Sequence, residues 1–545
     1  MRADTLRIYK DVHTWTGIVA GLALFIAFYA GALTMFKEPI ARWASPPSAG
    51  AQAVPLAQAP ALIAGVLAQR PEAAQEFRLH LRAAEHIPAR MVWHLHDGPP
   101  GSVAEEAHHD ERRHYTATLE PAGGVRVDEA HPSELADFID TLHRVVGLPV
   151  DNDPNRIVMG IVCVLYAVAL VSGVIILLPT LVEDLFALRL GHNLKRLWRD
   201  AHNVVGVFSL PFHLVMALTA AVFAFHDGIY AVQDRFIHDG RLEALWGRPP
   251  PPDQAPTRDP AAMLSPEALV GKVVAIAPGF EPLMLQYTRV TGPRAGVRVW
   301  GRDSTGITRS AAGGFAVLDP YSGRIVSTDY LPGHQPPANA TVTSFFTLHF
   351  GSFGGTPVTW MYFALGLAGA FLFYSGNLLW IESRRKRRGA QQTTSARWMS
   401  ALTVGVSLGC VIGLSLTIAA AKWLHGAADL PFWHKAVYYA AFFGATGWAC
   451  VRGAGRAAPE LLWAAAIATV AIPLTSLVAA VFPGIGGSWT HTSAAALGVD
   501  LTALAGAAAF AWMACVSARR ARAGAPDSVW AARFTAAGRA GPAHR

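Results

Sequence analysis

The sequence predicts an α-helical polytopic membrane protein with about eight spans and two small α+β domains outside the cytoplasm. Three observations lead to this prediction. The 545 residues are 52% apolar but only 15% charged, whereas soluble domains have about 25% charged residues. Apolar stretches long enough to cross a membrane recur along the chain. Motifs that flank the first two stretches occur again beside the next two, which indicates an internal duplication.

Each predicted span is a run of about 20 predominantly apolar residues. The first run is longer than the apolar core of a typical signal peptide, so we interpret it as an uncleaved span. The sixth run is the shortest. The eight spans cover residues 15–36, 157–178, 204–225, 358–381, 402–421, 436–451, 461–482 and 493–516.

Basic residues fall in every second loop between the spans. Lys and Arg precede the first span, lie between the second and third, and follow the fourth, sixth and eighth. Because short loops rich in Lys and Arg stay in the cytoplasm, both termini are predicted to be cytoplasmic. The net charge of +7 then reflects orientation in the lipid, and we expect no nucleic-acid partner.

This orientation divides the chain into seven segments. Each of the two long outer segments is predicted to begin with a short helix and continue with alternating strands. The Pro- and Gly-containing stretches 120–124 and 319–323 are typical of hairpin turns. The segments are span one (1–36), outer domain one (37–156), spans two and three with their loop (157–225), outer domain two (226–357), span four with a basic loop (358–390), a four-span extension (400–520) and a cytoplasmic tail (521–545).

Three pairs of motifs support the duplication. One pair precedes spans one and three, one precedes spans two and four, and one lies late in spans two and four. A unit made of a span, a small domain and a second span therefore occurs twice. The pairs are Asp11-Val12-His13 with Asp200-Ala201-His202, Thr141-Leu142-His143 with Thr347-Leu348-His349, and Ser172-Gly173 with Ser375-Gly376.

Four histidines occupy equivalent places in the two repeats. His13 and His202 lie at the cytoplasmic mouths of spans one and three, and His143 and His349 lie just before spans two and four on the outer side. Polar groups near membrane depth are costly and usually functional. Imidazole is an axial ligand of haem iron, and facing helices can supply one each. We therefore predict two bis-histidine haem sites, although interfacial or capping roles are the alternative.

Other histidines leave alternatives open. His213 lies 11 residues after His202, which on one continuous helix is about three turns and puts both on the same face. It is a rival ligand for the outer haem, a residue lining the electron path, or a buried hydrogen-bonded histidine; His226 is a further rival. His94 and His96 alternate on a predicted strand and so share a face. They form a candidate iron or copper site or belong to a solvated surface cluster.

These motifs resemble those of the PepSY-associated transmembrane family, which includes iron-regulated membrane proteins and haem-containing siderophore reductases. The resemblance covers about residues 1–390, and the turns at 120–124 and 319–323 look like those of PepSY domains. The matching motifs are His13-x-x-x-Gly17, Gly31-Ala32-Leu33-Thr34, Leu142-His143-Arg144, His202-x-x-x-Gly206, Leu348-His349-Phe350-Gly351 and Ser375-Gly376-Asn377-Leu378-Leu379-Trp380.

The resemblance implies an oxidoreductase of the ferric-siderophore reductase type in a bacterial inner membrane. It implies two haem b groups that pass electrons outward to a ferric siderophore, or another ferric chelate, in the periplasm. Ferrous iron is held less tightly by hard oxygen ligands, so reduction would release the metal. The chain has no Gly-x-Gly-x-x-Gly nucleotide motif, so we expect electrons from quinol or a separate cytoplasmic reductase. Residues 400–520 lie outside the resemblance; partner docking or a quinol site is an open interpretation there.

Two alternatives belong to other functional classes. A non-catalytic sensor or scaffold would use the PepSY-like domains to bind a protein or peptide, with structural histidine pairs. An accessory or transport subunit would take part in moving iron or siderophore across the membrane. The few ionisable residues within the spans argue against proton-coupled transport.

Overall fold

The computed structural model describes most of the chain. The described residues are 3–47, 54–82, 89–96, 112–120, 124–130, 132–180, 194–241, 257–303, 306–310, 313–385, 392–427, 429–485, 489–491, 493–524 and 528–532. They form two compact units. The helical unit comprises Met1–Ser45, Ser133–Ala224 and Tyr362–Arg545, and the sheet unit comprises Pro46–Pro132 and Phe225–Met361.

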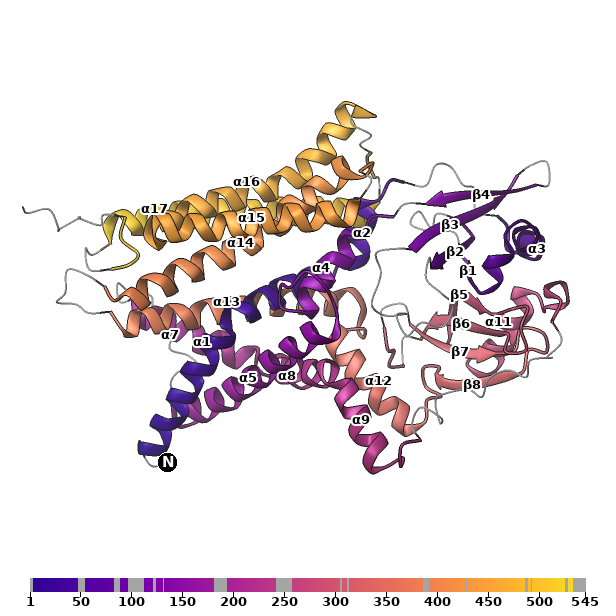
Figure 1. Ribbon diagram of the computed structural model, residues 1–545, viewed down its shortest axis with the longest axis horizontal. Helices are drawn as coiled ribbons and strands as arrows, with labels where there is room; N and C mark the ends of the chain where they lie inside the picture. The colour runs from indigo at the N-terminus through magenta and orange to yellow at the C-terminus, as the bar shows by residue number, and fades with distance from the viewer. Residues whose placement is uncertain are drawn as a thin grey trace, which may run out of the picture. The chain divides into compact units, whose positions relative to one another are not determined.

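The first part of the helical unit is built from long apolar helices and two short amphipathic ones (Figure 1). Asn152 caps α5 by accepting a hydrogen bond from the Asn155 N–H at 3.0 Å, and Pro154 occupies the first turn, where its missing N–H costs nothing. The short helix α4 packs against α1, α2, α14 and α15. The helices are α1 (Ala3–Thr34), α2 (Lys37–Ala44), α4 (Leu135–Arg144), α5 (Asp153–Leu177), α7 (Leu194–Phe208), α8 (Leu210–Ala224) and α13 (Gly355–Ser383).

The predicted third span is not one continuous helix. It divides at Ser209 into α7 and α8, whose axes differ by 70°. Pro211 has no backbone N–H to continue the hydrogen-bond ladder, and its ring clashes with the preceding turn, so the break follows from its position. The expectation that His202 and His213 share one helix face was therefore wrong, because it assumed an unbroken helix.

Several helices are long and apolar enough to cross a membrane. Within the described residues six meet this test, or seven if α7 and α8 together form one span. The six are α1, α5, α13, α14 (Thr394–Leu424), α16 (Ala454–Val481) and α17 (Ala494–Ala523). The predicted sixth span corresponds to α15 (Leu430–Arg452), which has 23 residues but is not among them. The protein is thus a multi-pass membrane protein, and the total of eight spans stays a prediction.

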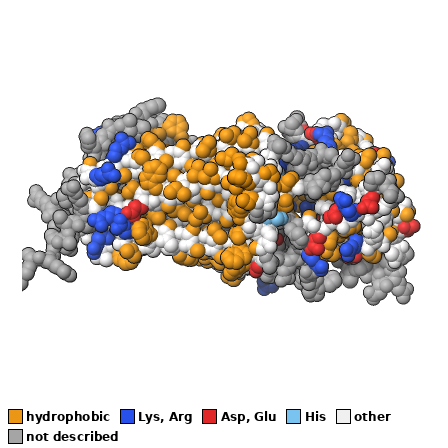
Figure 2. All heavy atoms as spheres, turned by 90° about the horizontal axis from the view of Figure 1, so that it is seen from above, with side chains coloured by type: hydrophobic (Ala, Val, Ile, Leu, Met, Phe, Trp, Pro, Cys, Tyr) orange, Lys and Arg blue, Asp and Glu red, His pale blue; other side chains and the backbone are white. Residues whose placement is uncertain are grey.

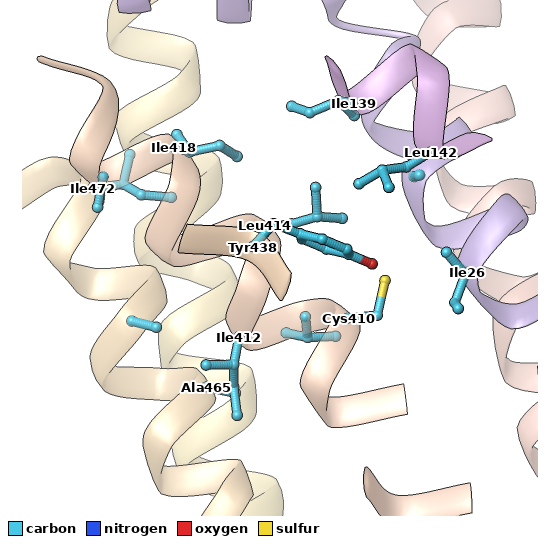
Figure 3. Close-up of a cluster of buried hydrophobic side chains, with 14 of the residues drawn as sticks. Ile26, Ile139, Leu142, Cys410, Ile412, Leu414, Ile418, Tyr438, Ala465 and Ile472 are labelled. Carbon is cyan, nitrogen blue, oxygen red and sulfur yellow. The ribbon is translucent and has the colours of Figure 1, made fainter. Parts of the chain in front are cut away.

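Helices α14 to α17 form a C-terminal bundle. Helix α14 contacts both α15 and α16, and α16 packs along α17. A single buried apolar cluster joins this bundle to α1 and α4. Figure 3 shows Ile26 of α1 and Leu142 of α4 facing Cys410 of α14 and Tyr438 of α15 across this cluster. The extension is therefore packed into the same core as the preceding helices.

The surface of the helical unit is typical of a protein surrounded by lipid. Figure 2 shows hydrophobic side chains along its flank and Lys and Arg side chains gathered at one end. Exposed Arg384, Arg452 and Arg519 lie near the ends of α13, α15 and α17, respectively. Large apolar side chains such as Phe443 and Trp512 are about two-thirds exposed, at 64% and 66%, which is favourable only if lipid covers them.

The sheet unit contains one eight-stranded antiparallel sheet (Figure 1), ordered β4-β3-β2-β1-β5-β6-β7-β8. Helix α3 (Ala59–Gln69) precedes the first four strands and α11 (Pro266–Ile276) precedes the last four. Helices α9 (His226–Phe236) and α12 (Pro337–Phe350) complete the unit. The strands are β1 (Glu76–His80), β2 (Met91–His96), β3 (Arg112–Leu119), β4 (Val125–Ala130), β5 (Glu281–Thr288), β6 (Gly296–Arg302), β7 (Gly314–Leu318) and β8 (Ile325–Tyr330).

The two halves of the sheet meet where β1 pairs with β5. Phe77 lies opposite Tyr287 in the register, and their rings stack at 4.7 Å. Both rings belong to a core cluster shared by α3, α11 and strands from both halves. The segments predicted as two separate domains therefore share one sheet and one hydrophobic core.

Candidate functional site

His13 and His202 face each other in the helical unit. His13 lies on α1 and His202 on α7, and their ring centroids are 6.3 Å apart with an interplanar angle of 79°. His13 Nδ1 lies 2.7 Å from the carbonyl oxygen of Ala169 on α5. A carbonyl only accepts, so Nδ1 must carry the proton, which leaves a lone pair on Nε2. The predicted inner pair is thus adjacent in space, with the His13 ring in a defined tautomer.

His202 is held in a closely similar way. Its Nδ1 lies 3.0 Å from Ser375 Oγ on α13, and that hydroxyl donates to the Leu372 carbonyl at 3.0 Å. Because the Ser375 hydrogen is used on Leu372, the hydroxyl accepts from His202 Nδ1, and Nε2 again bears the lone pair. On α5, Ser172 likewise donates to the Ala169 carbonyl at 3.0 Å. The two Ser-Gly motifs therefore occupy matching positions beside the two histidines.

Glycines provide the space in which these rings lie. A Cβ on Gly173 would come within 2.9 Å of His13 Cε1, and one on Gly31 within 2.6 Å of His143 Nδ1. The glycines one turn after His13 on α1 and after His202 on α7 are not crowded in this way. Gly17 has no atom within 4 Å of the position that a Cβ would take, and Gly206 has only Leu372, at 3.7 Å. The first pair of glycines seats the rings, and the second pair keeps space open beside them.

The predicted outer pair is divided between the two units. His143 lies on α4, and its Nδ1 is 2.8 Å from the Ala27 carbonyl on α1, which fixes the tautomer as in His13. His349 lies in the last turn of α12 in the sheet unit, before Gly351, whose φ of +60° ends the helix. The pairing of His143 with His349 therefore stays a prediction.

His213 is buried in an aromatic cluster. It is 2% exposed on α8, and its Nδ1 lies 2.5 Å from the Tyr166 hydroxyl. The rings of Phe28 and Phe212 lie 5.5 and 5.6 Å from it. Its Nε2 has no hydrogen-bond partner within the described residues. A buried nitrogen without a partner is costly, so His213 remains a candidate ligand.

One family model, described as the PepSY-associated TM region, matches residues 11–383. The chain belongs to the PepSY-associated transmembrane family. This confirms the resemblance inferred from the motifs. The match begins two residues before His13 and ends with the last residue of α13, so it includes the four paired histidines and His213. No curated protein matches the chain.

In this PepSY-associated transmembrane protein, the structure does not test the predicted His94–His96 metal site or the role of His226 as a haem ligand. His94 lies opposite His114 on β3, with ring centroids 5.9 Å apart, but the side chain of His96 lies outside the described residues. Where side chains are described, no group of three His, Cys, Asp or Glu could hold a metal ion. His226, at the start of α9, has its Nε2 3.1 Å from Asp227 Oδ1.

A buried charged network in the C-terminal bundle was not anticipated from the sequence. Lys422 on α14 is 1% exposed and donates to Ser476 Oγ on α16 at 3.0 Å, while its Nζ lies 4.0 Å from the centroid of the Trp43 ring. Asp500 on α17 accepts hydrogen bonds from Trp43 Nε1 and Ser476 Oγ at 2.9 and 3.1 Å. Charged residues inside two otherwise apolar spans were the available signal. The network ties α2 to three helices that lie outside the family match.

Proposed function

We propose that this protein carries electrons across the membrane through two b-type haems and reduces a ferric siderophore, or another ferric chelate, in the periplasm. The geometry of His13 and His202 is the observation that supports it best. One iron could be held by both imidazoles only if their rings lie close together, with centroids roughly 6 Å apart, because each metal–nitrogen bond is about 2.0 Å long. The observed separation is 6.3 Å.

The surroundings of these two rings also fit a haem. Both Nδ1 atoms are held by groups on neighbouring helices, which is the outer contact that orients ligating histidines in metal sites. The glycines one turn after each ligand, Gly17 and Gly206, add no side chain next to the two rings. His13 and His202 would hold the inner haem, which would supply reversible one-electron chemistry at that position.

The outer haem is assigned to His143 and His349, with His213 as the alternative ligand. The Ala27 carbonyl fixes the tautomer of His143 and leaves Nε2 in the acceptor form. Phe28, Tyr166 and Phe212 surround His213 with close-packed rings that exclude water. Two sites at different depths would divide the roughly 30 Å of hydrocarbon into shorter steps. Quinol or a separate cytoplasmic reductase would donate the electrons.

The proposal includes a topology. Helix α15 is about 34 Å long at 1.5 Å per residue and packs beside α14 and α16, so we count it as a span, and α7 with α8 as another. The total is then eight, with both termini cytoplasmic in a bacterial inner membrane and the sheet unit in the periplasm. The arrangement of α3 with β1–β4 and α11 with β5–β8 supports two PepSY-like domains and a duplicated unit.

The visible spectrum of the full chain, expressed with ample haem and purified in detergent, tests this function. We expect a Soret band and, after dithionite reduction, a sharp α-band. His202→Ala should remove about half of the bound haem, because one of two sites loses a ligand. Haem per protein is measured as the pyridine complex, with His334→Ala, an exposed histidine of the sheet unit, as the matched control. A protein without these bands would instead be a non-catalytic sensor, scaffold or accessory subunit.

A further inference from the structure

Three aromatic rings cross adjacent strands on one face of the sheet. Along β6, Val297 and Val299 point into the core, so Arg298 and Trp300 lie on the opposite face. Trp300 pairs in register with Phe315 on β7, and Phe315 pairs with Tyr330 on β8. Their ring centroids are 4.4 and 5.1 Å apart. Trp300, Phe315 and Tyr330, all half-buried, form what we call the aromatic strip.

Two guanidinium groups accompany the strip. The Arg298 guanidinium lies 5.3 Å from the centroid of Phe315, and that of Arg309 lies 5.4 Å from the centroid of Tyr330. Across the part of the chain that the structure describes, neither forms an ion pair with a carboxylate. Arg309 is exposed. Their positive charge is therefore available to an anion, and a guanidinium can stack on a flat ligand while it contacts the charge.

The indole of Trp300 is fixed by a chain of hydrogen bonds through the sheet. Trp300 Nε1 donates to Gln286 Oε1 at 2.9 Å, and Gln286 Nε2 donates to Glu76 Oε1 at 2.8 Å. Gln286 is only 7% exposed, so its amide is held in place. A ring with one orientation loses little entropy when a ligand stacks on it, which favours binding.

The strip is connected to the helix that carries His349. Arg309 also lies over the ring of Phe346 on α12, 4.2 Å from its centroid. The neighbouring Thr308 carbonyl accepts hydrogen bonds from Thr347 Oγ1 at 2.7 Å and Ser352 Oγ at 2.9 Å. Phe346 precedes His349 by about one helical turn. A ligand on the strip would therefore contact the segment that is pinned to the last turn of α12.

We propose that the aromatic strip, with Arg298 and Arg309, is a binding site for a ferric chelate of the catecholate class. This inference rests on the proposed function and names its substrate class. A ferric tris-catecholate has flat aromatic rings and a net negative charge, so it complements both the rings and the guanidinium groups. A ferric trihydroxamate has neither feature and gains little from the same side chains.

Equilibrium dialysis with radioactive iron tests the assignment on the full-length protein in detergent. The probes are the ferric complex of a tripodal tris-catecholamide, a ferric trihydroxamate and ferric EDTA. Arg298→Gln and Arg309→Gln should each weaken tris-catecholate binding about tenfold, since each removes one positive charge that would contact the anionic complex. Trp300→Ala should weaken it similarly, and Trp300→Phe should restore most of the affinity. Arg324→Gln, an exposed arginine in the Asp319 turn of the same unit, should change nothing.

Each result decides between the possibilities. Tris-catecholate affinity that is unchanged in the Arg298, Arg309 and Trp300 variants overturns the site, and so does a tris-catecholate that does not bind at all, as expected if a peptide or a second copy of this chain uses the strip. If the same variants lose ferric EDTA affinity to the same extent, the site does not select aromatic chelates and is only a positively charged surface. The haem spectrum of each sample separates the two proposals. Strip-dependent binding without haem leaves this site standing and removes the proposed function, whereas haem with strip-independent binding removes only this site.

Discussion

The glycines along one face of α14 in the C-terminal bundle are surrounded differently from Gly17 beside His13 on α1. On α14, a Cβ at Gly405, Gly409 or Gly413 would lie within 2.7, 2.8 or 2.9 Å of Thr446, Phe442 or Tyr438 on α15. These three glycines are four residues apart, so they form one face of α14 along which α15 approaches closely. Beside His13, in contrast, Gly17 faces a region with no atom within 4 Å.

This difference indicates that glycines serve helix packing in α14 and the histidine site in α1. Lipid provides no hydrophobic drive for helices to associate, so small residues that let backbones approach closely are a main source of stability in a membrane. Helix α14 uses its glycines for such packing, and most of its apolar stretch is buried. On α1, in contrast, Gly17 has open space beside it one turn after His13. We infer that the close packing of α14 against α15 stabilises the bundle, whereas the space beside Gly17 serves the histidine site.

The largest expected effect comes from filling the glycine face of the bundle. In Gly405→Leu the added side chain must displace the backbone of α15, because the nearest atom is Thr446 Cα. We expect about 3 kcal/mol of destabilisation with haem per protein unchanged, measured by thermal unfolding in detergent. Gly444→Leu on α15, where a Cβ meets nothing within 4 Å, is the control. Loss of haem in folded Gly405→Leu protein would show that the two regions are not separable.

Gly173→Ala should destabilise the protein less than Gly405→Leu, but it should act directly on the histidine site. The new Cβ would press on the His13 ring at 2.9 Å from Cε1 and disturb its hydrogen bond to Ala169. Outer contacts of ligating histidines are typically worth ten- to a hundredfold in metal affinity. We therefore expect haem affinity at one site to fall about tenfold in a titration of the haem-free protein.

Gly444→Ala is the matched control for that titration, since it adds the same methyl group to an open position. If Gly173→Ala destabilises the fold as much as Gly405→Leu and leaves haem affinity unchanged, then Gly173 is a packing glycine like those of α14. The contrast between the two regions would then be lost.

The smallest effect is expected at Lys37 of α2, a helix that packs against both α4 and the bundle helix α17. Its Nζ lies 2.8 Å from Asp137 and 2.9 Å from Asp140 on α4. Burial alone would raise the pKa of Asp140, but Lys37, together with His143 and Arg144, lowers that pKa below the usual 3.8. Burial would lower the pKa of Lys37, but Asp140 and Asp137 raise it above 10.5. The ion pairs therefore contribute stability from about pH 4 to about pH 10.

Lys37→Met should lower the free energy of unfolding by about 1 kcal/mol near pH 7, a small value because Lys37 is partly exposed to screening solvent. The difference from the unmodified protein should disappear as the pH falls through the lowered pKa of Asp140, because the protonated carboxyl no longer attracts Lys37. Melting curves between pH 3 and pH 8 measure this. Lys195→Met, on the exposed side of α7, is the control. A difference that is constant with pH would mean that packing, rather than charge, holds α2 against α4.

The sequence was sufficient to predict features that depend on local pattern. Apolar length located the membrane helices, and the repeated order of motifs identified His13 and His202 as partners, but the Ser-Gly motifs were not linked to these histidines. The break between α7 and α8 was missed, although Pro211 was a visible signal, because apolar length alone does not distinguish one bent span from a straight one. Lys422 and Asp500 stood out as charged residues in apolar helices, but their pairing could not be predicted, since it depends on which faces of α14, α16 and α17 meet.

The pairing of β1 with β5 was also beyond prediction, and it has a consequence for how the protein is made. Glu76 and Gln286, neighbours in the finished sheet, are separated by 210 residues. At about 5–20 residues per second of synthesis, β1 waits on the order of ten seconds or more for its partner. During that time its backbone donors and acceptors form an open edge to which other chains could add. A nascent chain that stalls between the two strands would therefore expose an adhesive strand, so assembly should depend on steady elongation or on a chaperone that covers β1 until β5 arrives.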